Sequence, residues 1–325
     1  MSSIQRDNIN NAIRFNMRHA IPVGWFYNEV NQIPEAVFED FPGLRVTGLE
    51  EGGTYAQRKD FVYAVLEYQE VFSSLENDGK LGTCTWGNIL KQYAPVPSVE
   101  NFFINGDKRV PCASWGDDVK LLTWQDKEGL DLHKDGGWSK MGAGRDIRNV
   151  TIHWGGLYPK HCRDVLANRD LSSHFGTGRN IVYQWLNVSH KGWHAGWDNK
   201  LSIGIDICQQ PVDSRYDYYT GRGYEVERAS NTTGRGNKRI ITLDPFTAKA
   251  TRTLVLSLCK TFGIPLQAPR GADGKQSSGD VYHGVLPKAF VQKTFRGVVG
   301  HHHLSKTKWD VACWWDQIFE GTPLG

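Results

Sequence analysis

Residues 201–209 read LSIGIDICQ, and this short stretch decides the fold because apolar and polar residues alternate along it. Ile203, Ile205 and Ile207 fall on one face of the expected strand, and Asp206 falls on the other. A buried carboxylate needs a partner, because an unpaired charge inside a protein is costly. The pattern predicts a strand with a hydrophobic core behind it and an ionisable group in front.

A second stretch repeats this arrangement. Residues 149–156 read NVTIHWGG, so Val150 and Ile152 share one face and His153 lies on the opposite one. Residues 180–188, NIVYQWLNV, also resemble a strand. The sequence therefore predicts two strands that each present one ionisable side chain against an apolar backing.

A helix follows these strands. In the stretch LDPFTAKATRTLVLSLCKTFGIP, Asp244 is placed to cap the helix, Pro245 occupies its first turn and Gly263 ends it. Strands followed by helices predict an α/β catalytic domain, with a mixed central sheet flanked by helices.

The N-terminal part has a different character. Phe61, Val65, Tyr68 and Phe72 recur at helical spacing, which predicts a small, mainly α-helical domain. The stretch APVPSVE then reads as a linker, and NFFINGDKRVP reads as a hairpin with an Asn-Gly turn.

These changes in pattern predict two domains. The expected boundaries are 1–97 for the helical domain and 98–325 for the catalytic domain. Within the second, 98–145 is an entry segment, and 210–240 is a long insertion loop. The insertion suits either the rim of a substrate groove or a disordered surface segment.

Composition excludes some functions. Lys and Arg number 38 against 35 Asp and Glu, so a polyanion-binding surface and a nucleic-acid partner are not expected. The N-terminus lacks the apolar run of a signal peptide, and no later run is long enough to insert in a membrane. The expectation is synthesis in the cytoplasm without a Sec signal. Six widely spaced cysteines argue against a zinc ribbon or a disulfide framework, although a disulfide stays open.

Residues 298–315, VVGHHHLSKTKWDVACWW, raise the question of a metal site. Three consecutive histidines could form a metal site, a pH-sensitive patch or a solvated loop. Catalytic zinc takes three protein ligands from imidazole, carboxylate and thiolate groups and keeps one position open. His153, His301 and Asp310 would make such a set.

The order of motifs strengthens this interpretation. TIHW, SSHF, GWHAGW, SIGIDI and GHHHLSKTKWD follow one another in the sequence. Together they resemble the zinc-dependent N-acetylmuramoyl-L-alanine amidases, the family that includes amidase-type phage lysozymes and peptidoglycan recognition proteins. The resemblance covers about residues 100–325. It implies hydrolysis of the amide between N-acetylmuramic acid and the L-alanine of the peptidoglycan stem peptide.

Carried over by motif, the resemblance makes His153, His301 and Asp310 the Zn²⁺ ligands, with Cys313 as the rival for the third place. Asp206 stands where the family usually has a glutamate that activates the water, and Lys308 would stabilise the oxyanion. Aspartate is one methylene shorter, so either the strand lies closer or catalysis is slower. Some phage members use a tyrosine just before HF, where this chain has a serine.

The resemblance also implies a substrate groove, with candidate lining residues His194, Trp193, Trp154 and His174. Twelve tryptophans, many beside polar residues, suit a groove that binds sugar or peptide.

The N-terminal stretch DGKLGTCTW resembles the small helical peptidoglycan-binding domain of many wall hydrolases. The matching positions include Asp78, Gly79, Gly82 and Trp86. The alternative is a helical cap with a tight turn and no ligand.

The combined prediction is a bacteriolytic wall hydrolase whose partner is peptidoglycan and which acts at the cell wall or periplasm. It fits a phage endolysin that depends on a holin, or an effector loaded into an injection machine. The alternatives are a non-catalytic peptidoglycan receptor on the same fold and a metallohydrolase that acts on another acylated amine.

Overall fold

The protein is described here by a computed structural model. It describes residues 3–17, 41, 44, 54–72, 74–82, 84–85, 88–89, 101–113, 115, 119–142, 144–156, 158–221, 224–236, 239–271 and 279–322. The chain forms two compact units, one of residues 1–99 with 217–224 and one of residues 100–216 with 225–325.

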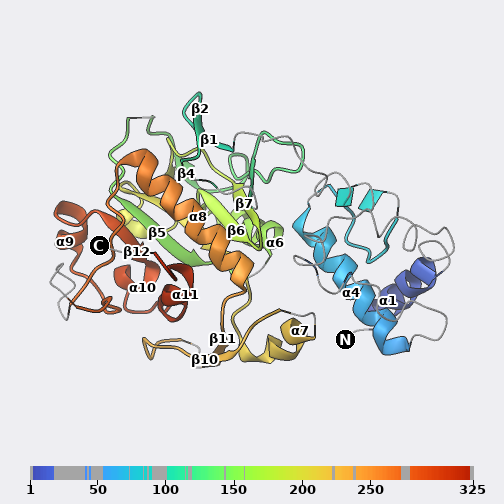
Figure 1. Ribbon diagram of the computed structural model, residues 1–325. Coiled ribbons are helices and arrows are strands. Elements are labelled where there is room, and N and C mark those ends of the chain that lie inside the picture. Colours follow the sequence, from blue (N-terminus) through green and yellow to red (C-terminus); the bar gives the residue numbers. More distant parts are fainter. Residues whose placement is uncertain are drawn as a thin grey trace. The chain divides into compact units, whose positions relative to one another are not determined.

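A mixed sheet forms the centre of the second unit (Figure 1). In the described part of the chain its strand order is β12-β5-β9-β6-β7-β3, and only the β6–β7 pair is antiparallel. The strands are β3 (Lys120–Thr123), β5 (Asn149–Trp154), β6 (Phe175–Gly178), β7 (Ile181–Gln184), β9 (Ser202–Ile207) and β12 (Gly297–Gly300). The α/β fold class with a mixed, helix-flanked sheet is confirmed.

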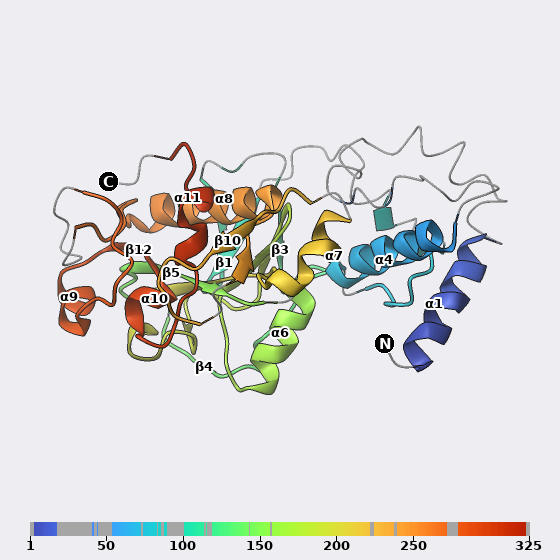
Figure 2. The ribbon, with the colours of Figure 1, turned by 90° about the horizontal axis from the view of Figure 1, so that it is seen from below.

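Helices cover both faces of this sheet. Figure 2 shows α8 (Pro245–Phe262) on one side and α6 (Pro159–Asn168) on the other. Contacts of β6 agree with this, because the Thr177 hydroxyl lies 2.7 Å from that of Thr251 on α8. A Cβ on Gly178 would instead lie 2.9 Å from Pro159 of α6. Thr177 therefore faces α8, and the next residue, Gly178, faces α6.

The alternation predicted for β5 and β9 places the core on the α8 side. Fully buried Ile203, Ile205 and Ile207 pack in one cluster with Leu254 and Leu258 of α8. The caps of α8 are as expected: the Asp244 carboxylate accepts from the Thr247 N–H at 2.9 Å, and Gly263 has the left-handed conformation. The polar residues of these two strands, His153 and Asp206, lie on the opposite face.

The expected strand at 180–188 is shorter than its pattern indicated. β7 ends at Gln184, whose side chain accepts from the Ile104 N–H at 2.7 Å and donates to the Ile104 carbonyl at 2.8 Å. Ile104 belongs to the predicted hairpin of β1 (Phe102–Asn105) and β2 (Lys108–Pro111), which the structure contains. The Gln184 side chain thus bonds to both the N–H and the carbonyl of Ile104, and joins β7 to the hairpin.

The remaining elements of the second unit are short. They are β4 (Trp138–Ser139), β8 (Lys191–Gly192), β10 (Arg228–Ser230), β11 (Arg239–Ile241), α9 (Lys288–Lys293), α10 (His301–Leu304), α11 (Trp315–Ile318) and the 3₁₀ turns 196–198, 213–215 and 312–314. All but the first residue of α7 (Tyr216–Thr220) belong to the segment 217–224 of the first unit. Much of the 210–240 insertion is thus structured. None of the helices in the described ranges has the length and apolar character needed to cross a membrane.

All six cysteines lie in described parts of the chain and are free thiols. Cys84 is exposed, Cys112 and Cys313 are half-buried, and the other three are buried. The disulfide that the sequence left open is not formed.

In the first unit, α1 (Ser3–Phe15) packs on α4 (Tyr55–Val71) through Ile9, Ala12, Ile13 and Val62. Thr54 caps α4, since its hydroxyl accepts from the Gln57 N–H and the Gln57 side chain bonds back to the Thr54 backbone. The helical character predicted for this part is seen in these two helices.

The DGKLG motif forms a turn that is anchored from within the unit. Gly79 has a positive φ of 69°, and its N–H donates to the Gln69 side-chain oxygen at 2.8 Å. The Asp78 carboxylate accepts from Gln69 at 3.0 Å and from the Lys80 N–H at 2.9 Å, while Gly82 follows in the same turn. These internal bonds explain the motif as a tight turn. Trp86 lies outside the described residues, and wall binding by this unit remains a prediction.

Candidate metal centre

Two adjacent parallel strands bring His153 and His301 together. His153 lies near the carboxyl end of β5, and His301 directly follows β12, which pairs with β5 through Gly300 and Ile152. The Nδ1 atoms of the two histidines lie 3.0 Å apart. The apolar backing of both strands fixes these rings at one edge of the sheet.

Asp310 completes the group. Its Oδ2 atom lies 3.2 Å from His301 Nδ1 and accepts from the Trp154 N–H at 3.3 Å. Two imidazole nitrogens and one carboxylate oxygen therefore converge on one point, a donor set that matches the three protein ligands of catalytic zinc. The residues present fit a zinc ion.

The protonation states suit metal binding. Burial, followed by the neighbouring His301 and His194, lowers the pKa of His153 well below its usual value, so this ring is neutral. Burial alone would raise the pKa of Asp310, but the hydrogen bond and charge of His301 lower it below the ordinary value. Neutral imidazole and ionised carboxylate are the forms that bind a metal.

His194 bonds to His153, the first candidate ligand. Its Nδ1 atom lies 2.9 Å from His153 Nε2, so when His153 keeps a lone pair on Nδ1, its Nε2–H donates to His194. The other nitrogen of His194, Nε2, is buried without a hydrogen-bond partner among the described residues. A partner on the far nitrogen of a ligand histidine fixes both its tautomer and its ring orientation. The place of His194 in a substrate groove, which the resemblance implied, remains a prediction.

Asp206 lies beside the candidate ligands. It is paired with His153 across β5 and β9 and shares its face of the sheet. Burial raises the pKa of Asp206 to about 6, and the charge of Asp310 adds to this. At neutral pH the side chain is thus an ionised carboxylate that can still accept a proton. Lys308 is exposed, and its positive charge acts to lower the pKa of both His153 and Asp206.

The other two histidines of the triplet have different surroundings. With His283 they form a second potential ligand group among the described residues, but hydrogen bonds already occupy it. His303 Nδ1 accepts from the Gly300 N–H at 2.9 Å, so its Nε2–H donates to the Tyr282 carbonyl. His302 Nδ1–H donates to the Asp310 carbonyl at 3.0 Å, and its Nε2 faces His283 at 3.3 Å. Of the three, His301 alone presents a ring nitrogen to the ligand group of His153 and Asp310.

The rival ligand and one groove residue lie elsewhere. Cys313 is not in the ligand group, and burial raises the pKa of its thiol to about 12. His174 is fully buried, with Nδ1 accepting from the Gly204 N–H at 3.0 Å and Nε2 next to the His190 carbonyl at 3.0 Å. The prediction that His174 lines the groove is therefore wrong, because both ring nitrogens serve backbone contacts inside the protein.

The two groove tryptophans are placed differently. Trp193 is 36% exposed, and its Nε1–H donates to the Ser139 hydroxyl at 3.3 Å. Trp154 donates from Nε1 to the Gln209 carbonyl at 2.7 Å and packs against Trp309. Trp193 is accessible to a ligand, and a role in substrate binding remains a prediction for both.

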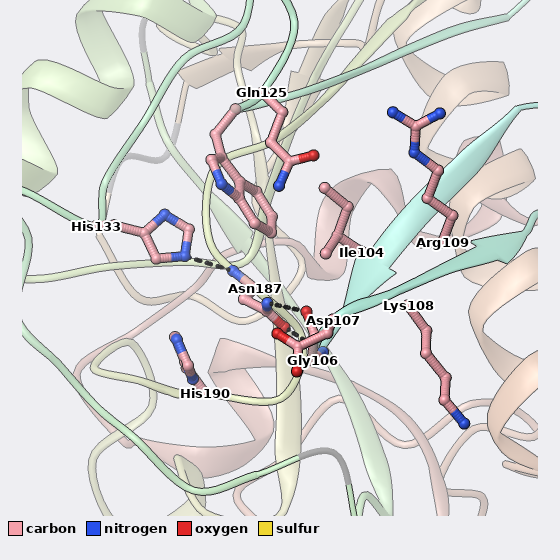
Figure 3. A pocket seen from close by; sticks show the side chains of 10 residues that line it. Ile104, Gly106, Asp107, Lys108, Arg109, Gln125, His133, Asn187 and His190 are labelled. Atoms are coloured by element: carbon pink, nitrogen blue, oxygen red, sulfur yellow. Dashed lines mark hydrogen bonds between the residues drawn. The ribbon is translucent and has the colours of Figure 1, made fainter.

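A separate cavity of about 430 Å³ lies beside the β1–β2 hairpin, and none of its lining residues is a metal-ligand candidate (Figure 3). His133 Nε2 accepts there from the Asn187 N–H at 3.2 Å, and the Asn187 side chain makes two bonds of 2.8 Å to the Gly106 backbone. His133 Nδ1 also lies 2.7 Å from Asp131. These polar groups hold the hairpin to the domain.

The comparison with protein families agrees with this geometry. Residues 143–312, more than half of the chain, match the family described as N-acetylmuramoyl-L-alanine amidase. The chain belongs to this amidase family. The matched region contains His153, Asp206, His301 and Asp310, whereas the β1–β2 hairpin lies before it.

Solved structures with some similarity to this amidase-family chain include LysC, an N-acetylmuramoyl-L-alanine amidase from Clostridium intestinale. It has 10% identity and a TM-score of 0.38, over 63% of this chain and 99% of that one. A mutant endolysin from Bacillus subtilis has 19% identity and a TM-score of 0.33, over 63% and 99%. The Drosophila peptidoglycan recognition protein SD has 15% identity and a TM-score of 0.36, over 64% and 97%. The comparison with curated sequences returned no match.

Sequence reasoning missed two features of this amidase domain. The contact of His194 with His153 could have been suspected, because GWHAGW lies close before SIGIDI in the chain. Arg235, which contacts the carbonyls of α10, gave no signal, since it lies in a Gly-rich stretch of the insertion.

Proposed function

We propose that this amidase-family chain is a zinc-dependent enzyme that hydrolyses the amide between N-acetylmuramic acid and L-alanine in peptidoglycan. The observation that carries the proposal is the convergence of His153, His301 and Asp310, with the Asp206 carboxylate on the same face of the sheet. This arrangement lies within the part of the chain that matches the family.

The chain's own residues have distinct tasks in this reaction. His153, His301 and Asp310 would hold the zinc ion, which when bound polarises a carbonyl and lowers the pKa of water towards about 7. The Asp206 carboxylate accepts the proton of the attacking water and passes it to the leaving amine nitrogen. Lys308 supplies a positive charge for the negative charge that develops on the carbonyl oxygen.

Three further roles belong to the proposal. Trp193 offers an exposed aromatic face for the sugar or peptide. Residues 1–97 form a wall-binding domain ahead of the amidase domain, 98–325. The chain acts on the cell wall as a bacteriolytic endolysin or an injected effector.

The first test measures new L-alanine amino termini released from purified peptidoglycan by the zinc-loaded protein. Release should stop with a chelator and return when zinc is added. Asp310→Ala and His301→Ala should each lose both the metal and the activity, because either change leaves two ligands. Reducing sugar ends in place of amino termini would show that a different bond is cut. Binding to sacculi without any cleavage would support the receptor alternative.

A further inference from the structure

The insertion contains a tight turn at residues 231–236. The Asn231 side-chain oxygen accepts from the Thr233 N–H at 3.0 Å and from the Thr233 hydroxyl at 2.8 Å. The Arg235 N–H donates in turn to the Thr233 hydroxyl at 3.3 Å. These bonds lie within the turn and stabilise it independently of its contacts with other segments.

Arg235 extends from this turn to the segment that carries His301. Its Nη1 atom donates to the carbonyls of His302 at 3.3 Å and Ser305 at 2.8 Å. Its Nη2 atom donates to the His283 carbonyl at 3.2 Å. Carbonyls at the end of a helix have no partner within the helix, and a cation there is favourable. One guanidinium therefore joins α10 to the loop of His283.

Gly236 lies against the other end of the same segment. A Cβ at this position would lie 2.7 Å from the indole nitrogen of Trp309 and closer still to its Cδ1 atom. Trp309 is 7% exposed and stands between Lys308 and Asp310 in the chain. The turn thus touches the stretch that carries the third ligand.

His302 connects these contacts to the ligand itself. The Asp310 carbonyl accepts from the His302 N–H at 2.9 Å and from its Nδ1–H at 3.0 Å. The carbonyl of His302 is in turn held by Arg235. The position of Asp310 relative to His301 is therefore fixed by a short chain of hydrogen bonds that begins in the insertion.

We propose that Arg235 and Gly236 form a brace that holds the ligand segment 301–310 in its metal-binding geometry. The retention of zinc then depends on the insertion, which contributes no ligand. This inference rests on the proposed zinc site. Groups that support ligands from outside the ligand set typically change metal affinity about 10- to 100-fold.

The test compares Arg235→Ala with Arg239→Ala, which removes an exposed arginine of the same insertion. Zinc affinity is measured by competition with a chromogenic chelator, and the geometry of the site by the absorption spectrum of the cobalt(II)-loaded protein. Arg235→Ala should bind zinc about 10-fold or more weakly and change the cobalt spectrum. Arg239→Ala should match the wild type in both measurements. Arg235→Lys should fall between them, because an ammonium group lacks the fork that contacts several carbonyls.

Two outcomes separate the proposals. If the wild type binds zinc and Arg235→Ala binds it equally well, the brace is refuted and the zinc site stands, even if the variant unfolds at a lower temperature. If the wild type binds no zinc, the zinc site itself is refuted. Should Arg235→Ala fail to fold, Gly236→Ala offers an independent probe. It is expected to weaken zinc binding by displacing Trp309, and unchanged affinity would overturn the brace.

Discussion

At the scale of single residues, three adjacent histidines have three different tasks. His301 presents a ring nitrogen to the ligand group, His302 holds the backbone of Asp310, and His303 bonds to the backbone on either side. The sequence favoured His301 because it directly follows Gly300, and the structure places it beside His153 and Asp310; its role as a metal ligand stays a prediction. The other two bond to backbone groups of Asp310, Gly300 and Tyr282, and the way the chain folds back to bring these groups together is not a local signal in the sequence.

Replacing the Asp206 carboxylate tests its proposed role as the base. Asp206→Asn keeps the size of the side chain and removes its ability to accept a proton, so kcat should fall by about 10²- to 10⁴-fold with zinc still bound. Asp206→Glu restores the acidic function and should retain much of the activity. Zinc content and kcat of both variants check this. A rate for Asp206→Asn close to that of the wild type would remove Asp206 as the base.

At the scale of elements, the surroundings of β9 explain why Gly204 stands two positions before Asp206. A Cβ on Gly204 would lie 2.7 Å from the His194 ring and 2.7 Å from the Ser173 hydroxyl. The small residue therefore makes room for the histidine that orients His153. The alternation of the strand predicted its two faces, but not the reason for this glycine.

Gly204→Ala should displace His194 and thereby the orientation of His153. We expect a loss of stability of about 1–3 kcal/mol, as is usual for overpacking, and zinc affinity reduced by about 10-fold. Gly144→Ala is the matched control, because its added methyl group meets open space. Thermal unfolding and chelator competition measure the two effects. Normal zinc affinity in Gly204→Ala would show that His194 does not act on the ligand.

The sequence predicted elements better than their boundaries. β5, β9, the hairpin and α8 with both caps were expected, because alternation and capping residues are local signals. The early end of β7 was not expected; its last residue, Gln184, bonds to Ile104 in the hairpin, a contact between distant residues that no local pattern indicates. The contacts that Arg235 and His283 make with α10 likewise join segments far apart in sequence, so no local pattern predicts them.

At the scale of the whole molecule, the buried polar layer beneath the site affects stability. Asp198 is fully buried, and its carboxylate accepts from Asn149 at 3.3 Å and from Thr151 at 3.4 Å. Burial nevertheless raises its pKa to about 7, from an ordinary value of 3.8. Between about pH 4 and pH 7 the folded state therefore keeps a proton on Asp198 that the unfolded chain has already released.

This linkage predicts the direction of a pH effect. The contribution of Asp198 to stability is fully present below about pH 4 and is lost as the pH rises through about 7, because the native state binds more protons. Asp198→Asn cannot ionise, so it should lose less stability than the wild type between pH 4.5 and pH 7.5. Melting temperatures at both pH values test this. Parallel changes in the two proteins would show that Asp198 titrates alike in both states.

The distribution of the thiols has a practical consequence for the unit whose task is least defined. Burial raises the pKa of Cys112, Cys259 and Cys313 to about 12, and Cys162 and Cys208 are enclosed in the interior. Since a thiolate is the reactive species, a maleimide dye at neutral pH should attach at Cys84. A fluorescent label would then mark the N-terminal unit without any substitution, and its polarisation on sacculi would report whether that unit adheres to the wall.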